Sequence, residues 1–143
     1  MKKNILLGFI FLAFMMPFRL SHANSSVIDS TVVPFFTALQ SGDLHVIKPY
    51  VGGDMYQKMM GAYEQNKDYG AFLKQRYDGA IFHPTVIEQS ENEMIVNVEV
   101  EFREKGISVF ELLVQKDKSG TWQIINQQTS TRRNSIQPDI SSQ

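Results

Sequence analysis

The chain has 143 residues, 43% of them hydrophobic, with no cysteine and with 14 basic against 15 acidic residues. This length and composition fit one globular domain with a modest core, and nothing in them indicates a chain that is disordered overall. The lack of cysteine excludes disulfides and thiolate chemistry, so stability must come from apolar burial.

The N-terminal residues 1–23 have the pattern of a secretory signal peptide. Lys2 and Lys3 give a positive start, residues 5–14 form an apolar run, and Ser21-His22-Ala23 fits a cleavage site. The alternative is an uncleaved membrane anchor, but the apolar run is shorter than the roughly 20 apolar residues that a spanning helix needs. We therefore expect a mature chain that begins at Asn24, is periplasmic or secreted, and keeps no stable membrane anchor after cleavage.

Removal of residues 1–23 would leave 11 basic and 15 acidic residues, a mildly acidic domain. This balance argues against nucleic acid as a partner. The sequence has no glycine-rich phosphate loop and no nucleophile elbow, and His45 and His83 stand in different elements without a second ligand at metal-binding spacing. We expect no cofactor and no metal.

A helix is predicted over residues 27–40, because apolar residues recur there at steps of three and four. Pro34 either kinks this helix or is its first-turn residue after an extended segment. Gly42 suits a left-handed residue that ends a helix, and Asp43 suits the cap of a short second helix over residues 44–50.

Two more helices are predicted before the strands begin. Asp54 and Gln57 have the spacing of a capping box, which predicts a third helix from there. A fourth helix over residues 69–77 would have Asp68 as its cap and would turn Phe72, Leu73 and Tyr77 inward.

Four strands are predicted after Gly79, where the apolar period changes to two. Short linkers between them favour antiparallel hairpins. The fold class is therefore α+β, with N-terminal helices packed on a curved antiparallel four-stranded meander. The domain would cover residues 24–131, followed by a flexible C-terminal tail over residues 132–143. The predicted strands cover residues 80–89, 93–103, 107–116 and 121–130.

The sequence Phe-Phe-Thr-Ala-Leu-Gln-Ser-Gly-Asp-Leu over residues 35–44, with a late hairpin over residues 110–125 that contains Trp122, resembles the NTF2-like superfamily. The resemblance implies a cone of helices on a curved sheet, with a pocket that is either open for a ligand or filled by side chains. Catalytic members resembling steroid isomerases would need an aspartate on a strand and a tyrosine on the first helix, and this sequence has neither.

Two residues are candidates for catalysis. His83 is the one histidine on a predicted strand, and the tyrosines of the helices could lie opposite it. A neutral imidazole there could transfer a proton near pH 7, or His83 could be a structural residue. Glu111 lies between Val109 and Leu113, where it could be a buried acid of raised pKa, an outer-face residue, or the partner of Arg103 on the neighbouring strand.

The candidate ligand-binding residues are tyrosines and one methionine that the predicted helices could turn toward the pocket. We expect an exported, non-catalytic module that binds a small apolar ligand or a periplasmic protein partner. The alternative is a small isomerase or dehydratase that uses His83 with a tyrosine or Glu111. A homodimer through the outer face of the sheet is a further possibility. The candidate binding residues are Tyr50, Tyr56, Met59, Tyr63 and Tyr77.

Overall fold

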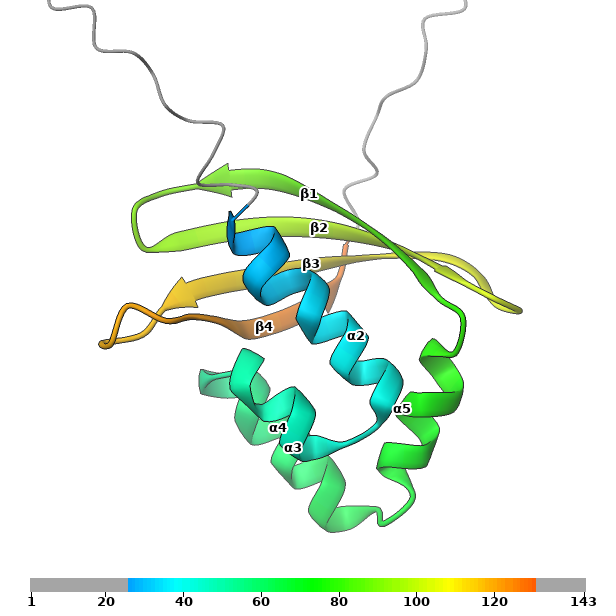
Figure 1. Ribbon diagram of the computed structural model, residues 1–143. Coiled ribbons are helices and arrows are strands. Elements are labelled where there is room, and N and C mark those ends of the chain that lie inside the picture. Colours follow the sequence, from blue (N-terminus) through cyan, green and yellow to red (C-terminus); the bar gives the residue numbers. More distant parts are fainter. Residues whose placement is uncertain (1–25, 131–143) are drawn as a thin grey trace, which may run out of the picture.

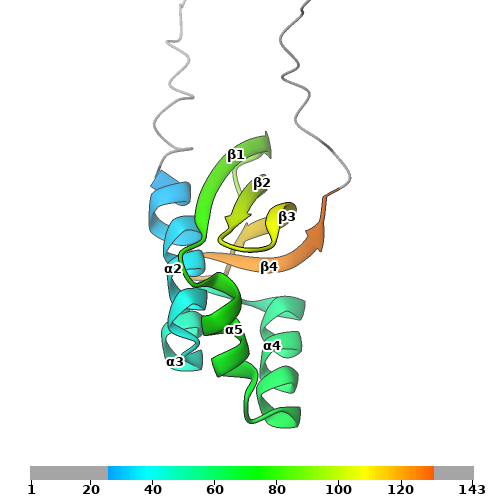
Figure 2. The same cartoon turned by 90° about the vertical axis from the view of Figure 1, so that its right-hand side faces the viewer.

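The computed structural model describes residues 26–130. The expected signal peptide and C-terminal tail lie outside the described residues, so both stay predictions. Within the described part, four antiparallel strands form one meander in the order β1-β2-β3-β4. The helices lie on one side of this curved sheet (Figures 1 and 2). The predicted α+β class is confirmed.

The first helical segment is continuous through Pro34, but its hydrogen bonding changes just before the proline. A π-helical turn, η1 (Ile28–Val32), leads directly into α2 (Val33–Ser41), which has Pro34 in its first turn. Because proline has no N–H to donate, the wider turn in front of it accommodates the missing bond. The residues before Pro34 are helical, so the alternative of an extended segment is wrong.

The turn after α2 follows the sequence prediction. Gly42 has a φ of 65° and ends the helix in the left-handed region, where glycine has no steric cost. Asp43 caps α3 (Leu44–Ile47), because its carboxylate accepts a hydrogen bond from the His45 N–H at 2.8 Å. A 3₁₀ turn, η2 (Lys48–Tyr50), follows.

The longest helix, α4 (Gly53–Gln65), packs against β4. Gly52 is its N-cap and no side chain caps it, so the predicted capping box of Asp54 and Gln57 is wrong. The next helix, α5 (Tyr69–Tyr77), packs against α2, and Phe72 on it is 46% exposed, against the prediction that it turns inward.

The side chain of Gln40 joins α2 to the start of the sheet. Its amide donates to the carbonyl oxygens of Tyr77, at 3.1 Å, and Ala80, at 3.2 Å. Tyr77 is the last residue of α5, and its carbonyl, which has no partner within the helix, also accepts from the Ala80 N–H at 3.1 Å. Ala80 directly precedes β1. The bond fixes the corner at which the chain passes from α5 into β1.

The strands agree with the sequence prediction to within a residue at most ends. Two register shifts interrupt the strand pairing. One lies in the pairing of the first strand with the second, between positions Val86 and Glu88, and the other in the pairing of the third strand with the fourth, between positions Leu113 and Val114. In β2 the side chains from Met94 to Phe102 that alternate toward the helices are buried, and this inner face forms the core. The strands are β1 (Ile81–Gln89), β2 (Glu93–Phe102), β3 (Gly106–Lys116) and β4 (Trp122–Thr129).

The helices are held on the sheet by aromatic and aliphatic packing. Phe36 of α2 is fully buried, and its ring centroid lies 4.7 Å from that of Phe82 on β1 and 6.3 Å from that of Tyr77 on α5. Burying one such side chain contributes roughly 1.5–3 kcal/mol. This cluster therefore anchors α2 between α5 and the sheet.

The two outer strands of the sheet differ in what lies beside them. β1 is an edge strand that contains Pro84 and a register shift. β4 is bordered by the segment after η2, where Val51 bridges Ile124 and the Gly52 N–H donates to the Ile124 carbonyl at 3.0 Å. No helix among residues 26–130 has both the length and the apolar character needed to cross a membrane.

Candidate functional site

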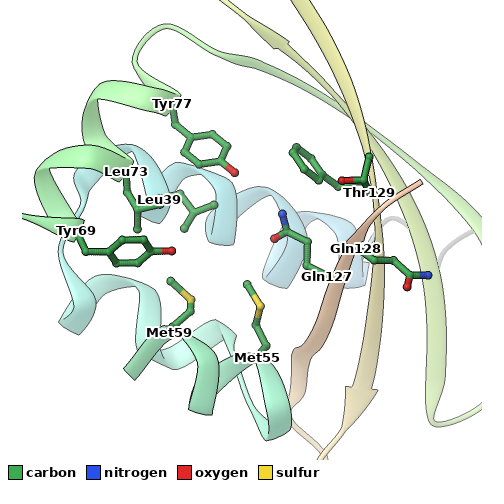
Figure 3. Close-up of a pocket in the computed structure, with 10 residues that line it drawn as sticks. Leu39, Met55, Met59, Tyr69, Leu73, Tyr77, Gln127, Gln128 and Thr129 are labelled. Atoms are coloured by element: carbon green, nitrogen blue, oxygen red, sulfur yellow. The ribbon is translucent and has the colours of Figure 1, made fainter. Parts of the chain in front are cut away.

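A pocket of about 240 Å³ lies between the helices and the far end of the sheet (Figure 3). Three helices and two strands contribute to it, from positions 90 residues apart in the chain. Helices α2, α4 and α5 supply one wall and strands β3 and β4 the other. The lining residues are Leu39, Met55, Met59, Tyr69, Leu73, Tyr77, Phe110, Gln127, Gln128 and Thr129.

The helical wall of the pocket is apolar. Leu39, Met59 and Leu73 are each at most 4% exposed, and Met55 is half-buried beside them. Met55 and Met59 are four residues apart on α4, so they occupy neighbouring positions on one helix face. Thioethers adapt to irregular apolar shapes, which makes this wall suited to a small apolar body.

The strand wall supplies the polar groups. Figure 3 shows the Gln127 side chain extending toward the helices and the Gln128 side chain extending to the other side of β4, as strand alternation requires. The Gln127 amide and the Arg76 guanidinium lie beside the phenol of Tyr77, and both act to lower its pKa. The rim includes Gln128 and Thr129, which are exposed. The pocket thus has one end able to hydrogen-bond a ligand.

The phenols beside the pocket keep their protons. Burial raises the pKa of Tyr77 above the ordinary value of 10.0, although the positive charge of Arg76 beside it and, to a lesser degree, the nearby Gln127 amide oppose the shift. Burial likewise raises the pKa of Tyr69. Both hydroxyls are therefore neutral donors at physiological pH, and no side chain in the lining is charged.

Of the five predicted ligand-binding residues, Met59 and Tyr77 line this pocket. Tyr63 does not, because its hydroxyl donates to the Gly42 carbonyl at 2.9 Å and its ring packs edge-on against Tyr69. Tyr50 and Tyr56 pack against the outside of the core cluster and are also absent from the lining. Tyr50, Tyr56 and Tyr63 therefore lie outside the lining of this pocket.

The two catalytic candidates are on the outer face of the sheet. The His83 side chain is 53% exposed, and its Nε2 lies 2.9 Å from a carboxylate oxygen of Glu101. Its neighbours Phe82 and Pro84 face the core side instead. The predicted placement of His83 opposite the helical tyrosines is wrong, because that placement needs the other strand face.

Glu111 is half-buried on the same outer face. Its carboxylate accepts a hydrogen bond from Gln128 Nε2 at 3.0 Å, and Asn97 is its neighbour on β2. Arg103 lies instead 3.4 Å from Asp78, so the predicted cross-strand pair with Glu111 is wrong. His83 and Glu111 therefore share a face with each other but share no cavity with any tyrosine of the helices.

Leu73 and Tyr77 are buried on α5, as the sequence predicts, and both line the pocket. Tyr69 belongs to the same predicted helix, but only the packing of α5 against α2 shows that it too faces the pocket. Gln127 is directly opposite the buried Leu112 in the sheet, so its side chain is on the inner face of β4. A register shift precedes it, so counting along the sequence alone does not place it.

Within residues 26–130, no group of three or more histidines, aspartates or glutamates is placed to hold a metal ion. Comparison of the chain with protein-family models, with curated proteins and with solved structures gives no match. The chemistry of the pocket therefore has to be argued from its own residues.

Proposed function

We propose that the chain is an exported, non-catalytic module that binds a small apolar ligand with one uncharged hydrogen-bonding end. The observation that carries the proposal is the pocket itself, apolar on its helical wall and polar at Gln127 and Tyr77. Ligand sites commonly combine a mostly apolar lining with a few placed polar groups.

Membership of the NTF2-like superfamily is part of this proposal. It is supported by the order of elements, four helices and then a curved meander, and by the Gly42-Asp43 break between α2 and α3. The location of the pocket, between the helices and the inner face of the sheet, is the one that the resemblance implies. Fold resemblance alone assigns no activity.

The lining also indicates the size and charge of the ligand. A volume of about 240 Å³ is below the roughly 300–1,000 Å³ of sites for drug-sized molecules. Although the Arg76 guanidinium lies beside Tyr77, no charged side chain is in the lining itself, so a carboxylate or ammonium ligand would lose its hydration without a charged partner inside the pocket. A neutral alcohol or phenol keeps its hydrogen bonds through Gln127 and the Tyr77 hydroxyl.

Fluorescence titration with 1-naphthol, a neutral aromatic alcohol, tests the proposal. Met55→Trp should fill the pocket and reduce naphthol affinity at least about tenfold, since an indole would occupy the apolar space. Met60→Trp, on the same helix but outside the lining, is the matched control and should bind as the wild type does. Equal loss in both variants, or no binding by the wild type, would refute the proposal.

The polar end is tested by comparing ligands. Gln127→Leu should weaken 1-naphthol binding by about three- to tenfold and leave naphthalene binding unchanged, because only the alcohol uses the amide. Anionic 1-naphthoate should bind the wild type more weakly than 1-naphthol.

The enzyme alternative has less support. His83 and Glu111 lie on the outer face of the sheet, away from the pocket, and neither contacts a tyrosine among the hydrogen bonds of the described residues. A general acid or base must lie within hydrogen-bond reach of the reacting group. The pocket itself contains no carboxylate, histidine or lysine in its lining.

A further inference from the structure

The outer face of the sheet, turned away from the helices, is acidic. In the described strands this face carries five glutamates and no lysine or arginine, and His83 beside Glu101 is its one basic side chain. Lys116 packs instead on the ring of Trp122, with Nζ 5.2 Å from the ring centroid. The five glutamates are Glu88, Glu93, Glu99, Glu101 and Glu111.

Apolar side chains lie between these carboxylates. Ile81 is 54% exposed and Ile107 is 62% exposed at one end of the face. Ile95, Val109 and Leu113 are half-buried along its middle. A hollow of about 110 Å³, lined in part by Ile95, Leu113 and Glu111, lies over strands β2, β3 and β4. The face therefore offers both apolar contact and negative charge.

Asn97 stands at the centre of this face, in one cross-strand row with Thr85, Glu111 and Gln128. It is 1% exposed, and neither its amide nitrogen nor its amide oxygen has a hydrogen-bond partner among the described residues. Native proteins rarely leave a buried amide unpaired, since that costs about 1–3 kcal/mol. An added group that shifts the neighbouring side chains could supply these bonds.

We propose that the outer face binds a cationic polypeptide segment of another protein. Lysine or arginine side chains of the partner would pair with Glu99, Glu101 and Glu111. Its apolar side chains would cover Ile95 and Leu113. This inference is independent of the ligand pocket, which is on the opposite side of the sheet.

Charge selects this occupant over a second copy of the chain. In a two-fold dimer through this face, the same glutamates of both copies would approach one another. Like charges brought together at an interface are unfavourable, whereas a basic segment is attracted to the face. Homodimerisation, expected as a possibility from the sequence, is therefore an outcome for the test to distinguish.

A short fluorescein-labelled peptide of alternating lysine and valine serves as the probe, with a glutamate and valine peptide as its control. Anisotropy should report binding of the lysine peptide alone, weakened by raising salt from roughly 20 mM to roughly 0.5 M. The combined variant Glu99→Gln, Glu101→Gln and Glu111→Gln should lower affinity about tenfold or more.

The matched control removes three acidic charges from the helical layer, with Asp29→Asn, Asp54→Asn and Glu64→Gln, all exposed. It has the same net charge as the outer-face variant and should keep wild-type affinity for the lysine peptide. If both variants weaken binding equally, the lysine peptide is attracted by the net charge of the protein and not by the outer face, and the proposal would fail. Thermal melts of both variants confirm that each is folded.

Two further measurements identify the occupant. The side-chain amide signals of Asn97 in a ¹⁵N spectrum, assigned with Asn97→Val, should move when the lysine peptide is added, and binding that leaves them unmoved refutes the proposal. Sedimentation equilibrium should show a monomer, whereas a dimer that the outer-face variant dissociates would make a second copy the occupant. If Arg132→Gln with Arg133→Gln raises peptide affinity more than the charge-matched Lys58→Gln with Lys67→Gln in the helical layer, the chain's own C-terminal residues compete for the face, and the proposal of a separate partner is wrong.

Discussion

The hydroxyl of Tyr63 on α4 donates a hydrogen bond to the carbonyl oxygen of Gly42, 2.9 Å away in the turn that ends α2. The same glycine touches α5, because its backbone lies against that of Gly70. Three helices, α2, α4 and α5, thus meet around one residue.

Tyr63→Phe should lower the free energy of unfolding by about 1 kcal/mol, since it removes one partly buried hydrogen bond and keeps the ring. Urea denaturation measures this change. Affinity for 1-naphthol should be unaffected, because Tyr63 is outside the pocket lining. A loss of naphthol affinity at unchanged stability would contradict this prediction and would mean that Tyr63 contacts the ligand.

Gly42→Ala should destabilise the protein by about 3 kcal/mol or more. The φ of 65° disfavours a side chain, and a Cβ at this position would overlap the carbonyl oxygen of Gly70. Gly61→Ala is the matched control, because no atom lies within 4 Å of its added Cβ inside α4. That variant should gain roughly 0.5–1 kcal/mol from helix propensity. Thermal or urea unfolding of the pair compares them, and similar stabilities would contradict the close approach of α2 and α5.

Asn97→Val should stabilise the isolated protein by about 1 kcal/mol. The substitution removes a buried amide without partners and places a residue of high strand propensity on β2. The midpoint of urea denaturation measures the gain. If stability falls instead, the amide has hydrogen bonds in solution that the described residues do not show.

Tyr77 makes the stability of the protein sensitive to alkaline pH. Burial raises its pKa in the folded state, so the fold favours the neutral phenol. This contribution is complete below the unfolded pKa of about 10 and is lost as the pH rises through the higher folded value. Between pH 8 and about pH 11, wild type should therefore lose more stability than Tyr77→Phe. Denaturation at several pH values tests this, and parallel profiles for the two proteins would contradict it.

The order of the elements could be predicted because each has a local cause. Gly42 and Asp43 end one helix and start the next through their own backbone and side-chain chemistry. The alternation of β2 is regular enough to identify both its faces. The start of α4 was predicted to within one residue, but its capping was not, because Gly52 is the N-cap and no side chain participates. The π-helical turn before Pro34 likewise depends on packing that keeps the segment helical.

The candidate site was less predictable. Alternation shows that His83 and Phe82 occupy opposite faces, but not which face the helices cover. The contact between Phe82 and Phe36 determines which face of β1 the helices cover, and these two residues are far apart in the sequence. The tyrosines of α4 were ambiguous for the same reason, since helical spacing places Tyr63 on a side of α4 without showing what that side meets. The pocket is assembled from five elements, so no short motif represents it.

The two edges of the sheet bear on how the protein behaves at high concentration. An unpaired strand edge can template the addition of further strands, which is a common start of aggregation. Pro84 removes one backbone donor from β1, and the register shift after Val86 bends the same strand. On the other side, Val51 and Gly52 occupy part of the edge of β4 at Ile124. Both edges of the meander are therefore poor templates for strand addition. This lowers the tendency of a chain without disulfides to aggregate at high concentration.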